Sequence, residues 1–151
     1  MKYFMMSNRF KKCVYEDFGL IHIDGKFIKK DDLSEWEPCS FFDFGWGEEN
    51  GYFKKPLGDF NFLMKIIFLD DEEDSYGAAS MILDYYPLEL KKFIKTEIIE
   101  KKTKYDLKRL DKVFNLTNPI NRTIKLGMNI DEIENEYQEW LIISKFFIEN
   151  L

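Results

Sequence analysis

The clearest periodic pattern of apolar positions lies at the C-terminal end of the chain. Asn129 and Glu132 have the spacing of a helix N-cap and its third residue. Apolar residues then return every three or four positions over about five helical turns. These positions are Ile130, Ile133, Tyr137, Trp140, Leu141 and Ile148. The pattern predicts a long helix over residues 130–148 whose first half has an acidic outer face.

The segment 60–69 fits two patterns. Phe60, Leu63 and Ile67 fall on one side of a helix. The same segment also alternates as a buried strand would, at Phe60, Phe62, Met64, Ile66 and Phe68. We expect a helix here, and the strand stays open as the alternative.

Further helices are expected in the second half of the chain. Ser75 is placed to cap a helix that stops before Pro87, because the residue preceding a proline avoids the α region. Pro87 then suits the first turn of the next helix. Thr103 and Asp106 resemble a capping box that opens another. A short helix is expected over residues 118–127, ended by its glycine.

The first 56 residues show β signals and no helical period. Asp24-Gly25 lies between two short β-prone runs, and this pair suits a two-residue type I′ turn. A small hairpin is therefore predicted over residues 18–30. Between Asp31 and Pro56 many aromatic residues mix with glycine and proline, which predicts an irregular or short-stranded stretch.

Residues 69–87 resemble the turn and second helix of a HEAT-type repeat. An acidic turn follows an apolar segment there, and the next helix carries the small residues Gly77, Ala78 and Ala79. The resemblance implies helical hairpins around residues 60–100 that stack in series, with these small residues letting helices approach closely.

These elements predict a mainly α fold with a small N-terminal β-hairpin region. Residues 1–56 would form the hairpin and the aromatic-rich stretch, and residues 57–151 would form stacked antiparallel, HEAT-like helical hairpins. No linker divides the chain, so a single domain over residues 1–151 is expected. The alternative is an α+β fold with residues 60–69 as a buried strand.

Composition narrows the classes of partner and compartment. The formal net charge is −6, and the chain holds 19 Lys but only 3 Arg. Both features disfavour nucleic-acid binding, and a basic partner is expected instead. The chain has no run of 18 apolar residues and no signal-peptide core near Met1, so neither a membrane segment nor secretion is expected. A cytoplasmic location would keep Cys13 and Cys39 as thiols.

Catalytic chemistry has little support in the sequence. His22 is the only histidine and has no companion ligands, and the common cofactor and hydrolase motifs do not occur. We therefore expect no catalytic residue, metal or cofactor. The enzyme alternative is carboxylate chemistry on a sugar-like ligand, carried by Asp43, Glu48 or Glu49 beside aromatic residues.

Two surfaces are candidates for partner binding. The first is an acidic run that would attract a basic partner and lacks the spacing of a calcium-binding loop. The second combines carboxylates with Trp and Tyr, which are common anchors at interfaces. The candidate residues are Asp70, Asp71, Glu72, Glu73 and Asp74 in the first surface, and Asp43, Trp46, Glu48, Glu49 and Tyr52 in the second.

In overall character the chain resembles the small acidic immunity proteins of bacterial polymorphic toxin systems. The shared features are the size, the acidic balance, the acidic run and the scattered aromatic residues. The resemblance implies a protein that binds and neutralises a cognate toxin domain through an acidic surface. A structural adaptor made of helical hairpins is the third hypothesis. The identity of the partner and the oligomeric state are left open.

Overall fold

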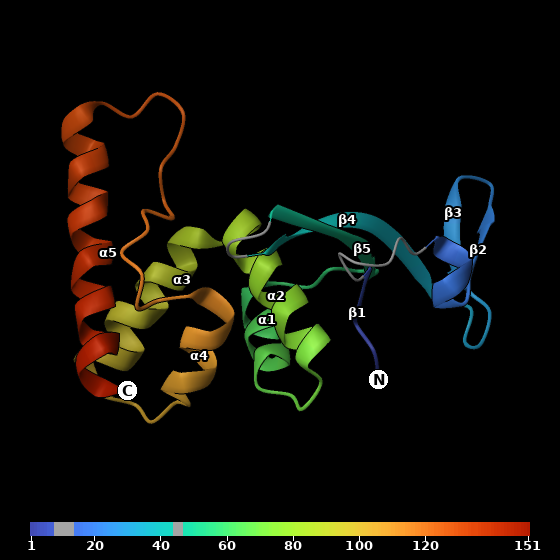
Figure 1. Ribbon diagram of the computed structural model, residues 1–151, viewed down its shortest axis with the longest axis horizontal. Helices are drawn as coiled ribbons and strands as arrows, with labels where there is room; N and C mark the ends of the chain where they lie inside the picture. Colours follow the sequence, from blue (N-terminus) through green and yellow to red (C-terminus); the bar gives the residue numbers. More distant parts are fainter. Residues whose placement is uncertain (8–13, 44–46) are drawn as a thin grey trace. The chain divides into compact units, whose positions relative to one another are not determined.

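A computed structural model describes residues 1–7, 14–43 and 47–151, without the side chains of residues 42–43 and 47–49. The chain divides into two compact units, Met1–Met81 and Ile82–Leu151 (Figure 1). The first unit contains a sheet and helical segments, and the second contains helices. The prediction of a single domain over residues 1–151 stays a prediction.

The sheet of the first unit is antiparallel throughout. Within the described residues five strands pair in the order β1-β5-β4-β3-β2. The strands are β1 (Phe4–Met6), β2 (Leu20–Ile23), β3 (Lys26–Lys29), β4 (Glu35–Asp43) and β5 (Gly47–Lys54). The predicted hairpin is confirmed, because Asp24 and Gly25 join β2 to β3 with φ values of 49° and 76°.

One face of the sheet has a small apolar core of its own. Met5, Leu20 and Trp36 are buried together there. The short 3-10 helix η1 (Tyr15–Phe18) adds two aromatic rings, and Phe27 and Tyr52 complete the cluster from β3 and β5. The aromatic residues of this cluster therefore belong to η1 and to the strands that pack on it.

The first unit also contains α1 (Phe60–Ile67), and α2 (Glu72–Tyr85) begins there and continues into the second unit. Asp59 caps α1 by accepting a hydrogen bond from the backbone N–H of Phe62 at 2.9 Å. The helix expected for residues 60–69 is thus confirmed, and the alternative strand is wrong.

The fold is α+β, so the prediction of a mainly α chain of stacked, HEAT-like hairpins is wrong. The physical reason is visible at Gly77 on α2. A Cβ atom placed on Gly77 would lie 2.2 Å from Cγ of Phe4, so the small residue admits a ring from strand β1. Phe4 in turn makes an edge contact with Phe41 of β4, with ring centroids 5.8 Å apart. The small side chain therefore serves a helix-to-strand contact.

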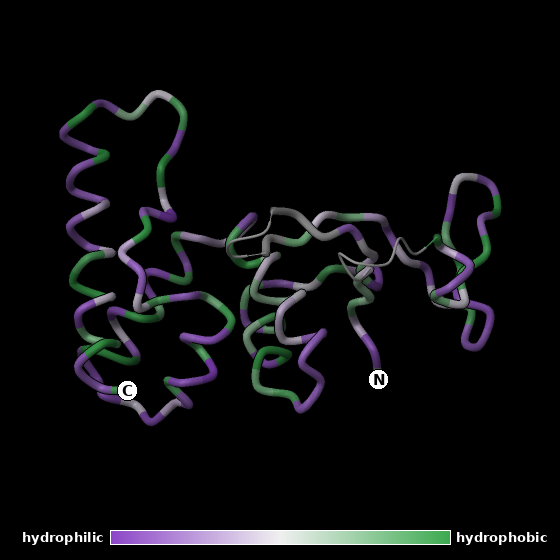
Figure 2. The backbone as a smooth tube through the Cα atoms, in the orientation of Figure 1, coloured by the Kyte–Doolittle hydropathy of each residue, from purple (hydrophilic) through white to green (hydrophobic). Residues whose placement is uncertain are grey.

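The second unit is helical. Its elements are the end of α2, α3 (Pro87–Phe93), the π-helix η2 (Ile94–Glu100), α4 (Leu107–Phe114) and α5 (Ile130–Asn150). Figure 2 shows hydrophobic and hydrophilic residues alternating along α5, as expected for an amphipathic helix. The buried side chains of this unit include Leu90, Ile94, Ile98, Leu110, Phe114, Trp140, Ile143 and Phe147. The long C-terminal helix and the start of a helix at Pro87 are confirmed.

Four local predictions are wrong in detail. Ser75 lies inside α2, where its buried hydroxyl donates to the carbonyl of Ile67 at 2.8 Å. Helix α4 is capped by Asp106, which accepts from the N–H of Arg109 at 3.0 Å, and not by Thr103. Residues 118–127 form no helix in the described structure, and their glycine lies in a turn. Strands β4 and β5 are nine and eight residues long, where an irregular or short-stranded stretch was expected between Asp31 and Pro56.

Candidate functional site

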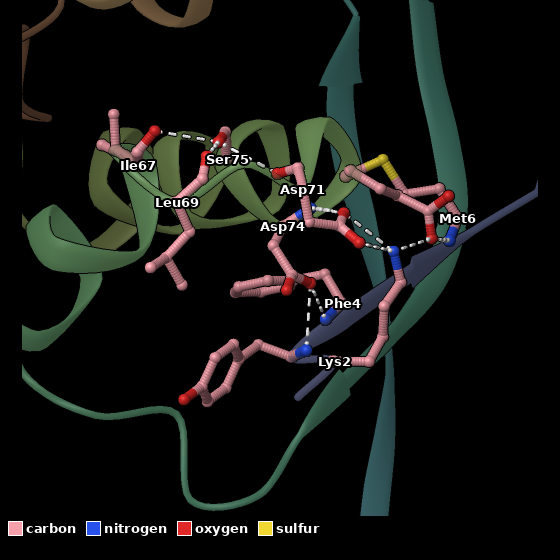
Figure 3. A network of polar contacts seen from close by, with 10 residues as sticks. Lys2, Phe4, Met6, Ile67, Leu69, Asp71, Asp74 and Ser75 are labelled. Atoms are coloured by element: carbon pink, nitrogen blue, oxygen red, sulfur yellow. Dashed lines mark hydrogen bonds and ion pairs between the residues drawn. The ribbon is translucent and has the colours of Figure 1, made fainter.

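The acidic run at Asp70–Asp74 lies against the N-terminal strand (Figure 3). The ammonium of Lys2 donates to both carboxylate oxygens of Asp71 at 2.9 Å, and it lies 3.4 Å from Oε1 of Glu73. The carboxylate of Glu73 also accepts a hydrogen bond from the backbone N–H of Met6 at 3.1 Å. The contacts of Lys2 lower the pKa of Asp71, although burial opposes this shift.

Asp74 is the most buried acid of the run. Its Oδ1 atom accepts from the backbone N–H groups of Tyr3 at 2.9 Å and Phe4 at 2.8 Å, as Figure 3 shows. Its Oδ2 atom is buried without a hydrogen-bond partner in the described structure. Burial raises the pKa of Asp74, and the two backbone hydrogen bonds oppose this shift. The carboxylate therefore fixes strand β1 at a cost in solvation.

Three of the five acids thus bind the N-terminal segment of the same chain. Asp71 also accepts from the N–H of Asp74 at 2.9 Å, which is the bond expected of a helix N-cap. Asp70 and Glu72 are two further acids of the run, and both are exposed. Partner binding by the acidic run stays a prediction. The contacts described above also give the run a structural role.

Tyr52, predicted as a binding residue, belongs to a row of aromatic rings across one sheet face. Its ring makes edge contacts with Phe18 and Phe27, at centroid distances of 5.7 and 5.1 Å. Phe27 continues the row by stacking on His22 at 4.5 Å, and Tyr15 contacts both of these rings. We call these five residues the aromatic row. It runs from β5 to the outermost strand β2, and its members other than His22 are half-buried.

A cavity of about 310 Å³ adjoins the Tyr52 end of the aromatic row. It is lined by Phe18, Pro38, Cys39, Ser40, Asn50 and Tyr52. This volume is at the low end of the range for small-ligand sites and suits one side chain of a partner. Burial raises the pKa of the Tyr52 phenol, and so do Tyr15 and Cys39, so the hydroxyl stays protonated at neutral pH. The cavity therefore offers aromatic walls and neutral polar groups.

The described structure has larger hollows as well. One, of about 490 Å³, lies beside Tyr3, Pro56 and Phe62 in the first unit. The other, of about 430 Å³, lies beside Tyr105 and Phe146 in the second. Neither is lined by a residue that the sequence predicted to bind a partner. The Tyr52 cavity is smaller, but it coincides with a predicted residue and with the aromatic row.

The remaining predicted residues lie around the β4–β5 connection. The backbones of Asp43, Glu48 and Glu49 belong to the paired ends of β4 and β5, with Asp43 opposite Gly47. Their side chains, and Trp46 altogether, lie outside the described part of the structure. The register brings these three backbone positions to one end of the ribbon, nine residues or fewer from Tyr52. Carboxylate chemistry at this end stays a hypothesis.

His22 and Cys39 lie on or beside the aromatic row. His22 is exposed and stacks on Phe27, which is a packing contact. Cys39 is half-buried at the Tyr52 cavity, and Cys13 lies outside the described residues. Across the part of the chain that the structure describes, no group of three His, Cys, Asp or Glu residues is placed to hold a metal ion.

A polar network in the second unit was not predicted. The indole N–H of Trp140 donates to the hydroxyl of Thr123 at 2.9 Å, and this hydroxyl donates to the carboxylate of Glu136. Lys91 on α3 donates to the same carboxylate and lies 2.7 Å from Oε2 of Glu139. Burial favours a higher pKa for Glu136, but the hydrogen bonds from Lys91 and Thr123 prevail and lower it. The network ties α3 and residue 123 to α5.

Arg122 closes the end of α4 beside this network. Its guanidinium donates to the carbonyls of Phe114, Asn115, Asn118 and Ile120 and lies 4.9 Å from the ring of Trp140. Burial lowers the pKa of Arg122 to about 10, so it remains charged at neutral pH. Because its donors meet backbone carbonyls, Arg122 has a structural task.

Comparison of the chain with protein-family models, with curated proteins and with solved structures finds no match. No helix in the described residues has both the length and the apolar composition needed to cross a bilayer. The functional assignment therefore rests on the residues of this chain alone.

Proposed function

We propose that this protein is a binding module for a basic protein partner, acting in the cytoplasm in the manner of an immunity protein that neutralises a toxin domain. The observation that carries the proposal is the Tyr52 cavity at one end of the aromatic row. Half-buried tyrosines beside a cavity large enough for one side chain are typical of interface anchors.

The distribution of charge supports the choice of a basic partner. The chain has 28 acidic and 22 basic residues. Of these, 16 acids and 10 bases lie in Met1–Met81, and 12 of each lie in Ile82–Leu151. The whole excess of six negative charges thus belongs to the unit that carries the Tyr52 cavity. Such a field would speed the encounter with a basic partner and would be screened by salt.

The acidic run contributes to this negative field, whereas we assign Tyr52 as the residue that anchors the partner. Asp71, Glu73 and Asp74 already serve strand β1. Withdrawing them for a partner would leave backbone N–H groups of that strand without acceptors, at about 1–3 kcal/mol for each buried group. We expect Asp70 and Glu72 to act through long-range charge.

The test is co-purification from the native host with tagged protein. We expect one stoichiometric basic protein to be retained by the wild type and by the control Tyr85→Ala, which truncates an exposed tyrosine on α2. Tyr52→Ala should weaken retention by about ten-fold or more, as for an interface anchor. Asn50→Arg, an exposed change at the rim of the cavity, should do the same without removing an aromatic ring.

Two outcomes would overturn the proposal. One is the absence of any stoichiometric basic protein from the wild-type sample. The other is equal retention by the wild type, Tyr52→Ala and Asn50→Arg. Chemical denaturation of each variant shows whether it is folded. In a salt titration of the recovered pair, the association rate should fall steeply as the ionic strength rises.

A further inference from the structure

The Tyr52 cavity has an aromatic half and a polar half. In the register of β4 and β5, Pro38 lies opposite Tyr52, and two residues further along Ser40 lies opposite Asn50. Opposed and alternate residues of paired strands share a face, so all four side chains point to one side of the sheet. Phe18 adds its ring on the Tyr52 side. We call the first pair the aromatic rung and the second pair the polar rung.

The polar rung can accept hydrogen bonds from an incoming group. The hydroxyl of Ser40 donates to Oδ1 of Asn50 at 3.2 Å, so the Ser40 oxygen is the donor of this bond and its lone pairs can act as acceptors. Both residues of the polar rung are exposed, as is Pro38, and Tyr52 is half-buried. The two rungs are about 7 Å apart along the strands. A side chain that enters the cavity therefore meets a ring and polar acceptors together.

The basic residues of β3 and β5 are placed away from the cavity. Lys54 lies opposite Trp36, on the side of Tyr52 that is remote from the polar rung. The ammonium of Lys29 lies 5.8 Å from the centre of the Trp36 ring. Lys26 and the exposed Lys30 alternate with Lys29 along the chain, which directs them to the opposite face. Among the described residues, no Lys, Arg or His lines the cavity.

The acids around the cavity lie beside its walls. Asp17 precedes Phe18 in η1, is exposed, and accepts a hydrogen bond from the N–H of Val14 at 3.0 Å. The exposed Glu37 alternates with Pro38 and so belongs to the opposite face. The first unit holds 16 acids and 10 bases, an excess of six negative charges. The long-range field therefore favours a cation, although no carboxylate of the described residues lines the cavity.

These features select among the side chains that a basic protein can offer. An ammonium is strongly hydrated, and in the cavity it would lose water without gaining a carboxylate from the described lining residues. An apolar side chain would cover the polar rung without supplying donors to it. A guanidinium is weakly hydrated, stacks on aromatic rings, and directs its N–H groups outward in its own plane. Arginine therefore fits both halves of the cavity.

We infer that the Tyr52 cavity binds an arginine side chain of the partner. The inference rests on the proposed function, since it names the residue by which a basic protein would contact the first unit. The guanidinium would stack on the ring of Tyr52 and donate to the hydroxyl of Ser40 and the amide oxygen of Asn50. The same face of the sheet already holds one cation against a ring, at Lys29 and Trp36.

The probe is Nα-acetyl-arginine methylamide, and its comparators carry citrulline or lysine in place of arginine. The full-length protein is labelled with ¹⁵N, and its amide chemical shifts are followed as each compound is added at low salt. We expect the arginine compound to shift the amides of residues 39–40 and 50–52 and to saturate at about millimolar concentrations. The citrulline compound has nearly the same shape without the charge and should bind about two- to five-fold more weakly. The lysine compound should be weaker by about the same factor.

Matched variants separate stacking on the ring from other modes of binding. Tyr52→Leu removes the ring and should abolish saturable binding, whereas Tyr52→Phe keeps the ring and should retain it. Asn50→Leu alters an exposed residue of the polar rung and should weaken binding by about three-fold, because one acceptor is lost. Tyr85→Leu, at an exposed tyrosine of α2, is the control and should bind as the wild type does.

The inference is overturned if the arginine compound causes no saturable shifts at residues 39–40 and 50–52. It is also overturned if the citrulline or the lysine compound binds as tightly as the arginine compound does. Unchanged binding by Asn50→Leu or by folded Tyr52→Leu has the same meaning, and Asn50→Leu keeps the test valid if Tyr52→Leu does not fold.

The titration uses no native partner, so its failure is separate from failure of the proposed function. A lack of arginine binding with intact, Tyr52-dependent co-purification removes the arginine contact only. Arginine binding without any co-purified basic protein removes the proposed function and leaves the cavity as an arginine-binding site.

Discussion

Lys2 binds Asp71 through both carboxylate oxygens, each 2.9 Å from the ammonium, and so connects the start of the chain to a residue 69 positions later. The bond joins the segment before β1 to the start of α2. It gives the acidic run a task within the fold, because the adjacent acids bind backbone groups of the same strand. The charge of the run is partly compensated before any partner arrives.

Asp74→Ala is expected to destabilise the protein by about 2–4 kcal/mol, because the N–H groups of Tyr3 and Phe4 would lose their acceptor in a buried place. Lys2→Met should cost less than about 1 kcal/mol, since the ion pair that it breaks is part-exposed. Urea unfolding measures both values. Equal costs for the two variants would contradict the assigned role of Asp74.

Gly77→Ala is expected to destabilise the protein by about 1–3 kcal/mol, although alanine favours helices over glycine. The added methyl group would meet the ring of Phe4. The double variant Gly77→Ala with Phe4→Leu should show a coupling of about 1 kcal/mol or more in a double-mutant cycle. A stabilising effect of Gly77→Ala, or strict additivity, would show that the helix and the strand do not pack this closely.

Thr123→Val should cost about 1–3 kcal/mol, because the indole N–H of Trp140 and the carboxylate of Glu136 would each lose a partner at nearly constant side-chain volume. Thr123→Ser keeps the hydroxyl and should recover much of this stability. Thr103→Val is the matched control, since Thr103 is exposed. Thermal unfolding ranks the three variants, and a cost at residue 123 no larger than at residue 103 would contradict the network.

Asp74 and Glu136 should respond to acid in opposite directions. Burial raises the pKa of Asp74 above 3.8, so on acidification the folded state takes up this proton before the unfolded state does. The protonated acid therefore stabilises the fold, and this contribution is lost as the pH rises through the folded pKa. The pKa of Glu136 lies below 4.5, because its hydrogen bonds outweigh burial, so its contribution is lost as the pH falls through the folded value.

Urea unfolding of the wild type, Asp74→Asn and Glu136→Gln between pH 7 and pH 3 tests this difference. On acidification the stability of the wild type should rise relative to Asp74→Asn. Relative to Glu136→Gln it should fall. A change of the same sign in both comparisons would contradict the assigned environments of the two carboxylates.

Local signals in the sequence predicted the elements that local interactions determine. The Asp24-Gly25 turn, the N-cap of α5 at Asn129 and the start of α3 at Pro87 depend on residues within one turn. The sequence predicted an irregular or short-stranded stretch where β4 and β5 lie, because the apolar positions of these two strands form a pattern only when the strands are paired. Strand β1 is three residues long and pairs with residues 51–53, so its place is fixed by contacts distant in sequence.

The candidate site was predictable in part. The composition of the segment around Tyr52 identified it as a candidate binding residue, and the structure places it beside a cavity. The aromatic row could not be derived, since His22, Phe27 and Phe18 meet Tyr52 only through the strand order of the sheet. The acidic run looked like a free surface because no local pattern signals that Lys2 and β1 bind it.

The central claim is that the aromatic row and the Tyr52 cavity of the first unit bind a basic partner. Amide exchange of the full-length chain, measured with and without the co-purified partner, tests it most directly. The account predicts slowed exchange around the aromatic row and its cavity, in residues 15–29, 38–40 and 50–54. Slowed exchange confined to residues 70–76 or to Ile82–Leu151 would contradict it.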